Sequence, residues 1–307
     1  MRPQVADRFL PRLLERLAAR HGGTLVGAAL MVVACLTHGA MMAAVKGLAG
    51  TYPIWQILLM RSIGQFVMLI PLIVGTGGQV LKSERIGLQG LRAVLSFIAL
   101  MAAFYAIAHL PLAEASAISF LRIIFVVALA GIIFSDRIGA IGWAAAAMGF
   151  GGIVIMLDPS AEGLNEAAAI AAAGALVTAV VTITVKALTR SDSTATMMCY
   201  SAGGLTLLCL VPSVFTWKPI GWDDSPLFAL LIASALVTQW CFTNAYRHGE
   251  TSTIATVEYF RLVAAALIGL IIFAEVPTPG ALAGIALIMS ASFVAVRRER
   301  IRVWLFG

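Results

Sequence analysis

Long hydrophobic runs separated by short polar breaks make up most of the chain. A helix needs about twenty apolar residues to cross the roughly 30 Å hydrocarbon core of a bilayer. The breaks carry proline, glycine and charged residues, so neighbouring helices are expected to form tight antiparallel hairpins. Ten spans are predicted, over residues 24–46, 54–74, 88–108, 112–134, 139–157, 164–188, 195–215, 226–246, 251–274 and 279–296.

The positions of the positive charges indicate how these spans are oriented. Cytoplasmic segments next to membrane spans are enriched in lysine and arginine. Placing the N-terminus in the cytoplasm puts most basic residues of the breaks on that side and leaves Lys46 and Lys218 outside. Both termini of this multi-pass membrane protein are therefore expected to be cytoplasmic.

Composition agrees with an integral membrane protein. Hydrophobic residues make up 61% of the chain and charged residues 12%, whereas soluble domains carry about 25% charged residues. The formal net charge of +6 then reflects the ends of the spans, and no nucleic-acid partner is expected. No Gly-x-x-x-x-Gly-Lys-Ser/Thr pattern for nucleotide binding is found, and neither a cofactor nor enzymatic activity is predicted.

The N-terminal segment, residues 1–23, carries five arginines ahead of the first span. The span that follows is too long for the core of a signal peptide. Leucines and Phe9 alternate with the arginines, which is typical of an amphipathic helix lying on the inner membrane surface. A disordered basic tail is the alternative. A second basic tail is expected over residues 298–307.

The cysteines show neither Cys-x-x-Cys spacing nor a histidine at ligand distance, and all of them lie inside apolar runs. Neither a disulfide framework nor a metal site is expected from such positions. We interpret them as small buried side chains. They are Cys35, Cys199, Cys209 and Cys241.

The sequence also contains an internal repeat. Ser119-Phe120-Leu121-Arg122 in the fourth span aligns with Glu258-Tyr259-Phe260-Arg261 in the ninth, and Val45–Leu48 aligns with Val185–Leu188 at nearly the same offset. The predicted halves are residues 24–157 and 164–297, joined by an outer linker at 158–163. Because each half holds five spans, an odd number, the second half must enter the membrane in the opposite orientation, as in the inverted repeats of secondary transporters.

The same repeat predicts a site near the middle of the membrane. Arg122 and Arg261 both fall about eleven residues into their spans, which corresponds to roughly 16 Å at 1.5 Å per residue. In transporters built from inverted repeats, the substrate binds near the midplane between the halves.

Two further segments carry a family resemblance. Residues 104–116 (FYAIAHLPLAEAS) and 245–254 (AYRHGETSTI) resemble the EamA repeats of the drug/metabolite transporter superfamily. The resemblance covers about 24–297 and implies an all-α integral membrane fold with ten transmembrane helices in two inverted five-helix repeats. It also implies an acidic residue at the end of the helix that follows each segment, matched by Asp136 and Glu275. Because proteins of this superfamily transport many kinds of substrate, the fold alone does not identify the substrate of this chain.

Charged residues inside spans are the strongest site candidates, because they are costly in a bilayer unless they face a wet cavity or a partner. They are Arg61, Arg122, Arg261 and Glu258. A guanidinium can bind a carboxylate of the substrate, and a glutamate can meet an ammonium group or carry a proton. The alternative is a structural ion pair that locks the bundle.

The remaining candidates are polar or aromatic. His38 could shuttle protons, or it could donate a hydrogen bond across a helix interface. Amides beside aromatic rings are typical of a mainly apolar pocket with a few orienting groups, and Gln239 and Asn244 are favoured over the rings because unpartnered burial penalises amides. The aromatic candidates are Tyr105, Trp240 and Tyr259.

Small residues and lysines are interpreted structurally. The glycines of spans five and ten, including Gly152 and Gly284, predict close packing of these two helices or a homodimer contact. Lys46 and Lys186 are predicted to anchor the ends of their spans, or to gate the mouth of a cavity.

Together these observations predict an inner-membrane secondary transporter that moves small metabolites by alternating access. Within the family the chain looks most like the bacterial amino-acid and metabolite exporters, and this resemblance implies amino acids as substrates and export as the direction. One alternative is transport of cationic drugs or S-adenosylmethionine-like compounds, in which Glu258 would dominate recognition. The other is an intramembrane enzyme or lipid-handling protein, which the lack of paired carboxylates or a serine with a base disfavours.

Overall fold

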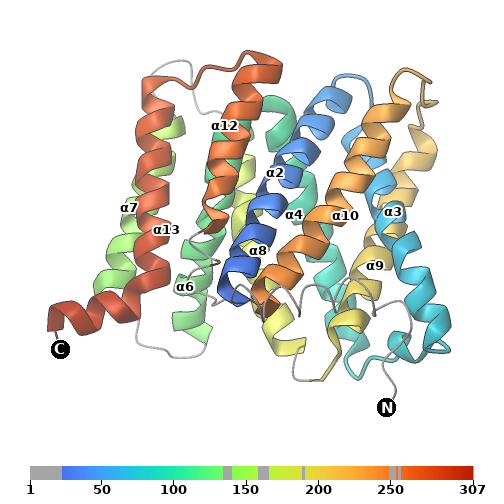
Figure 1. The fold of residues 1–307 in the computed structure, drawn as a ribbon, viewed down its shortest axis with the longest axis horizontal. Helices are drawn as coiled ribbons and strands as arrows, with labels where there is room; N and C mark the ends of the chain where they lie inside the picture. Colours follow the sequence, from blue (N-terminus) through green and yellow to red (C-terminus); the bar gives the residue numbers. More distant parts are fainter. Residues whose placement is uncertain are drawn as a thin grey trace.

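The computed structural model describes residues 23–133, 140–157, 166–188, 191–248, 254 and 257–306, and every regular element in these residues is helical (Figure 1). The linker predicted at 158–163 lies outside the described residues, as does the N-terminal segment up to residue 22. The tail predicted at 298–307 is helical up to Phe306, because α13 continues through it.

The helices follow the predicted spans closely. The first half contains α2 (Gly23–Ala49), α3 (Ile54–Gly75), α4 (Ile86–His109), α5 (Leu112–Ser119), α6 (Leu121–Ile133) and α7 (Ala140–Leu157), with a short 3-10 helix at Gln79–Leu81. The second half contains α8 (Glu166–Leu188), α9 (Thr194–Phe215), α10 (Ser225–His248), α12 (Phe260–Phe273) and α13 (Pro279–Phe306).

Two of the predicted spans are broken where the sequence analysis expected continuous helices. The span 112–134 is divided into α5 and α6 at Phe120, and the span 251–274 is interrupted at Tyr259, just before α12. At both breaks the backbone forms i→i+3 bonds: Ile123 N–H donates to the carbonyl of Phe120, and Leu262 N–H donates to that of Tyr259. Such bonds tighten a helix locally and often mark functional bends.

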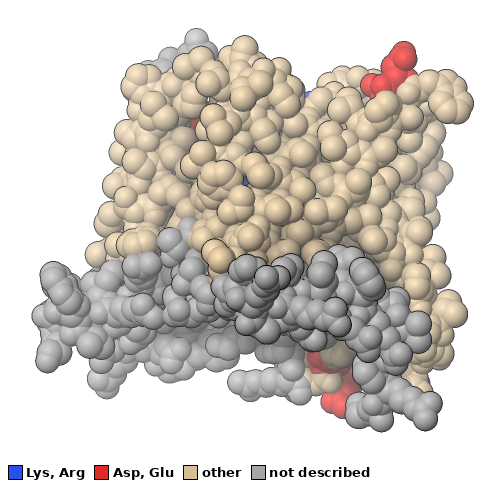
Figure 2. Space-filling model, in the orientation of Figure 1, with Lys and Arg blue, Asp and Glu red and all other residues tan. Residues whose placement is uncertain are grey.

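The apolar surface agrees with a membrane protein. Six described helices are long and apolar enough to cross a bilayer, and two shorter apolar segments are Phe260–Phe273 and Pro279–Ala291. Large apolar side chains such as Phe215 and Ile271 are 83% and 78% exposed, which in a membrane means contact with lipid. Figure 2 shows acidic side chains near the two ends of the molecule, and the described surface in this view carries few other charged atoms.

Packing pairs a helix of one half with a helix of the other. α2 packs on α10, α4 on α8, α3 on α9 and α7 on α13. Small residues allow the close approach: a Cβ added at Gly174 of α8 would lie 2.6 Å from that of Ala102 on α4, and one at Gly152 of α7 would lie 2.9 Å from the carbonyl oxygen of Gly284 on α13. The predicted packing of the fifth span on the tenth is therefore confirmed.

Loop contacts at opposite ends of the bundle also follow the repeat (Figure 1). Tyr52, after α2, donates to the carboxylate of Asp224 at 2.8 Å. Its equivalent in the second half is Asp192, after α8, whose carboxylate accepts from Ser83 at 2.5 Å, from Gln89 at 2.7 Å and from the backbone N–H of residue 84. Burial raises the pKa of Asp192, but these hydrogen bonds outweigh burial and lower the pKa below its usual value.

Candidate functional site

A cavity of about 330 Å³ lies between the two halves, walled by α2, α3, α4, α5, α6, α8, α9, α10 and α12. This volume is at the small end of the range for small-molecule sites. Five predicted site residues line the cavity: His38, Arg61, Arg122, Gln239 and Arg261. The repeat thus brings residues from helices of both halves to one space.

The other predicted site residues lie outside the cavity lining. Tyr105 stacks on His109 with ring centroids 4.1 Å apart. Asn244 donates to the carbonyl of Trp240 on its own helix at 2.9 Å, and Trp240 is 37% exposed. Glu258 and Tyr259 lie at the break before α12, next to the lining.

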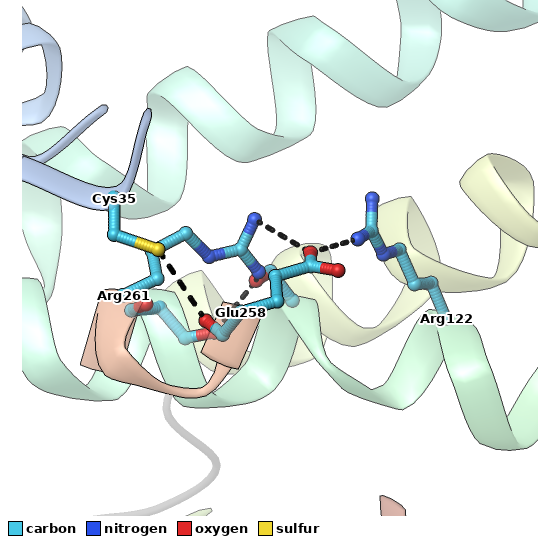
Figure 3. Close-up of polar contacts among 6 residues, drawn as sticks. Cys35, Arg122, Glu258 and Arg261 are labelled. Carbon is cyan, nitrogen blue, oxygen red and sulfur yellow. Dashed lines mark hydrogen bonds and ion pairs between the residues drawn. The ribbon is translucent and has the colours of Figure 1, made fainter. Parts of the chain in front are cut away.

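Glu258 connects the two arginines that the repeat aligns (Figure 3). Arg122 Nη2 donates to Glu258 Oε1 at 2.6 Å, and Arg261 Nη1 lies 3.8 Å from the same oxygen. Arg261 Nη2 also donates to Ser119 Oγ at 2.8 Å. Since Ser119 is the repeat equivalent of Glu258, each arginine binds the residue three positions before the other arginine. We call these four side chains the arginine crossing.

The two helix breaks meet at the arginine crossing. The rings of Phe120 and Tyr259 stack with centroids 5.2 Å apart, and the guanidinium carbon of Arg261 lies 4.6 Å from the centroid of Phe120. Cys35 Sγ donates to the carbonyl of Glu258 at 3.7 Å (Figure 3). Because a helix break exposes backbone carbonyls, such a side-chain donor helps to satisfy them.

Arg61 differs from the other two arginines. It lines the cavity, its Nε is buried without a hydrogen-bond acceptor, and within the described ranges no carboxylate lies within ion-pairing distance. A guanidinium in a membrane domain is costly unless it meets a partner or water. Arg61 therefore offers a positive charge to the cavity.

A second ion pair lies at one end of the bundle, which we call the Lys46 end. Lys46 pairs with Glu275 and donates to the carbonyl of Leu110 at 2.7 Å. The other oxygen of Glu275 accepts from the backbone N–H of Leu112 at 2.8 Å. This network joins α2, the turn between α4 and α5, and the segment after α12. The equivalent Asp136 and the side chain of Lys186 lie outside the described residues.

Several lining residues were missed by the sequence analysis. Gln65, Thr178 and Ser201 line the cavity. The threonine and serine gave no signal because small hydroxyl residues are common at helix interfaces in membranes. The repeat could have found two of them, since Thr178 and Ser201 are the second-half equivalents of His38 and Arg61. All four cysteines are buried, as predicted. Among the described residues, no group of three or more His, Cys, Asp or Glu could hold a metal ion.

Known proteins with similar sequences are transporters. The pseudopaline exporter CntI of Pseudomonas aeruginosa is 27% identical over 285 residues, which cover 89% of this chain and 97% of the exporter. An S-adenosylmethionine uptake transporter of Rickettsia bellii is 25% identical, covering 80% of this chain and 84% of its own. A riboflavin transporter of Vibrio cholerae is 28% identical, and the match covers 76% of this chain and 82% of that transporter.

The fold and both repeats are also matched. A solved crystal structure shares the fold at 17% sequence identity, with a TM-score of 0.61 over 91% of this chain and 99% of the other. The profile of the EamA-like transporter family matches twice, at residues 25–158 and 166–297. The chain therefore belongs to the EamA-like transporter family, as the resemblance in its sequence implied.

Proposed function

We propose that this protein is a secondary transporter of small metabolites that carry a carboxylate, such as amino acids, and that it favours export. It has ten spans in two inverted five-helix repeats and works by alternating access in a bacterial inner membrane, with both termini in the cytoplasm. The observation that carries the substrate class is the charge of the cavity.

The charge balance of the cavity is positive. Arg61, Arg122 and Arg261 contribute three positive charges and Glu258, beside the lining, one negative charge, which leaves +2 with His38 neutral. Inside a bundle these charges are poorly screened, so an anionic or zwitterionic substrate is favoured over a cation. The small volume favours a compact metabolite.

The relatives support transport but do not choose the substrate or its direction. Their names specify pseudopaline export, S-adenosylmethionine uptake and riboflavin transport, which involve different compounds and more than one direction. The proposed class of substrate therefore rests on the charges that line the cavity of this chain.

The main alternative is transport of cationic drugs or S-adenosylmethionine-like compounds through recognition by Glu258. The carboxylate of Glu258 already binds Arg122, has Arg261 nearby and is only 8% exposed. A substrate ammonium would have to displace a guanidinium to reach it. A carboxylate meets no such competition at Arg61 from the described residues, which favours the first proposal.

Alternating access needs one end of the bundle to be closed while the other is open. In this proposal the Lys46–Glu275 ion pair is the contact that closes the Lys46 end, which the positive-inside pattern assigns to the outside. The described conformation is then closed toward the periplasm, and release of substrate requires this ion pair to separate.

The test is exchange of labelled amino acids by purified protein in liposomes. Saturable exchange of at least one amino acid, absent from protein-free liposomes, is expected. Trp240→Phe should leave the exchange intact, because Trp240 lies outside the cavity lining and is exposed. If none of the twenty amino acids is exchanged, the amino-acid proposal fails, and flux of ethidium instead would favour the cationic alternative.

A further inference from the structure

The two sides of the cavity differ in polarity. The wall formed by α2, α3 and α10 contributes His38, Arg61, Gln65 and Gln239, whereas at repeat-related positions the wall formed by α4, α8 and α9 contributes Leu100, Thr178, Ser201 and Leu205. These are true counterparts, because the repeat aligns each residue of the first wall with one of the second. Helices of the first wall pack on one another, since α10 contacts both α2 and α3. Charge and amides therefore gather on one side and apolar or hydroxyl groups on the other.

The three arginines of the cavity are not equivalent. Arg122 and Arg261 are engaged by Glu258 and Ser119 in the arginine crossing. Arg61 has no such acceptor among the described residues, and its repeat counterpart is Ser201. The fold holds a small hydroxyl residue at the repeat-related position of α9, so the positive charge of Arg61 is particular to the first half.

We propose that Arg61 is the specificity-determining residue that binds the carboxylate of the substrate and directs the rest of the molecule toward the wall of α4, α8 and α9. This inference rests on the proposed function and adds an orientation to it. A guanidinium can bind a carboxylate through two parallel hydrogen bonds, which fixes both position and direction. Gln65 and Gln239 supply further polar groups on the same wall, and Leu100 and Leu205 receive the less polar end of the substrate.

The experiment compares each amino acid with its carboxamide, which has nearly the same shape but no negative charge. Liposomes containing the protein are loaded with labelled L-phenylalanine, L-methionine or L-threonine, and unlabelled acid or amide is added as a competitor. The wild type should prefer the acid. Arg61→Ser should weaken competition by the acid about 10- to 100-fold and change competition by the amide little, because a hydrogen bond between charged groups is lost.

Two further variants keep the test decisive. Arg61→Lys retains the charge without the paired donors and should lose part of the preference; it also serves if Arg61→Ser does not fold. Arg92→Ser is the matched control, because Arg92 on α4 lies outside the cavity lining and donates to the carbonyl of Met197 at 2.8 Å. It should leave the ratio of acid to amide unchanged.

The outcomes separate this inference from the proposed function. If the wild type exchanges amino acids and the Arg61 variants keep its ratio of acid to amide, the role of Arg61 is overturned while the transport function stands. An equal loss of the ratio in Arg92→Ser would also overturn it, since the effect would then be one of general stability. If the wild type exchanges none of the three probes, the proposed function fails for them and the inference with it.

Discussion

Glu258→Gln is the most informative perturbation of the arginine crossing. The substitution keeps the size of the side chain and removes its charge. Glu258 is 8% exposed, with Arg122 at 2.6 Å and Arg261 at 3.8 Å from the same oxygen. Without the carboxylate, two guanidinium groups face each other with no charge between them. The expected result is a loss of stability.

The magnitude follows from the two distances. At an effective dielectric constant of about 20, charges at 2.6 Å attract by about 6 kcal/mol and charges at 3.8 Å by about 4 kcal/mol. Desolvation offsets most of this attraction. Removing one partner of a fully buried pair costs about 3–5 kcal/mol, and an exposed pair contributes about 0.2–1 kcal/mol. Because Arg122 is 31% exposed, we expect a loss of about 2–3 kcal/mol, between these two limits.

The assay is equilibrium unfolding of the purified protein in mixed micelles, with a double-mutant cycle. Arg122→Gln combined with Glu258→Gln should cost less than the two single changes added together, because the double variant leaves no unpaired partner of this ion pair. Ser119→Ala is the control, since it removes a neutral acceptor of Arg261 but leaves the ion pair of Arg122 and Glu258 in place, so its cost should add to that of Arg122→Gln. Additive effects of Arg122→Gln and Glu258→Gln, or a Glu258→Gln protein as stable as the wild type, would refute the reasoning.

Three other perturbations test the ends and the packing of the bundle. Lys46→Met should release Glu275 and raise the labelling rate of a cysteine placed at Ala106, a cavity-lining residue, by an impermeant maleimide several-fold; an unchanged rate would contradict the gate. Gly152→Val, whose Cβ would lie 2.9 Å from the backbone of α13, should lower the free energy of unfolding by about 1–3 kcal/mol. Asp192→Asn should be less stable than the wild type above pH 3.8, and this difference should shrink as the pH falls through the lowered pKa of the carboxyl in the folded protein. A difference in unfolding free energy that grows toward acid pH would show that the sign is wrong.

The sequence predicted the three arginines that line the cavity because charged residues are rare in apolar spans. The internal repeat aligns Arg122 with Arg261, and the structure places both beside Glu258. The boundaries followed from length and hydropathy: the first span was predicted at 24–46 and α2 covers Gly23–Ala49.

The helix breaks could not be predicted in the same way. Breaks within helices usually carry proline or glycine, but Phe120 and Tyr259 are ordinary helix residues. Their local geometry accompanies a contact between residues far apart in the chain, the stacking of the two rings. The environment of Arg61 could not be predicted either. Among the described residues no carboxylate lies within ion-pairing distance of it, and this depends on how all the helices around the cavity are arranged.

The asymmetry of the arginine crossing has a physical reason that links it to the cavity. With acids at both repeat positions, each arginine could be neutralised and the crossing would attract no anion. With serine at both, three uncompensated guanidinium groups would share a small cavity and repel one another. One glutamate at 258 and one serine at 119 hold the helix breaks together while leaving the cavity positive. Arg61, on the more polar wall, then fixes where the carboxylate of the substrate binds and how the substrate is oriented in the cavity.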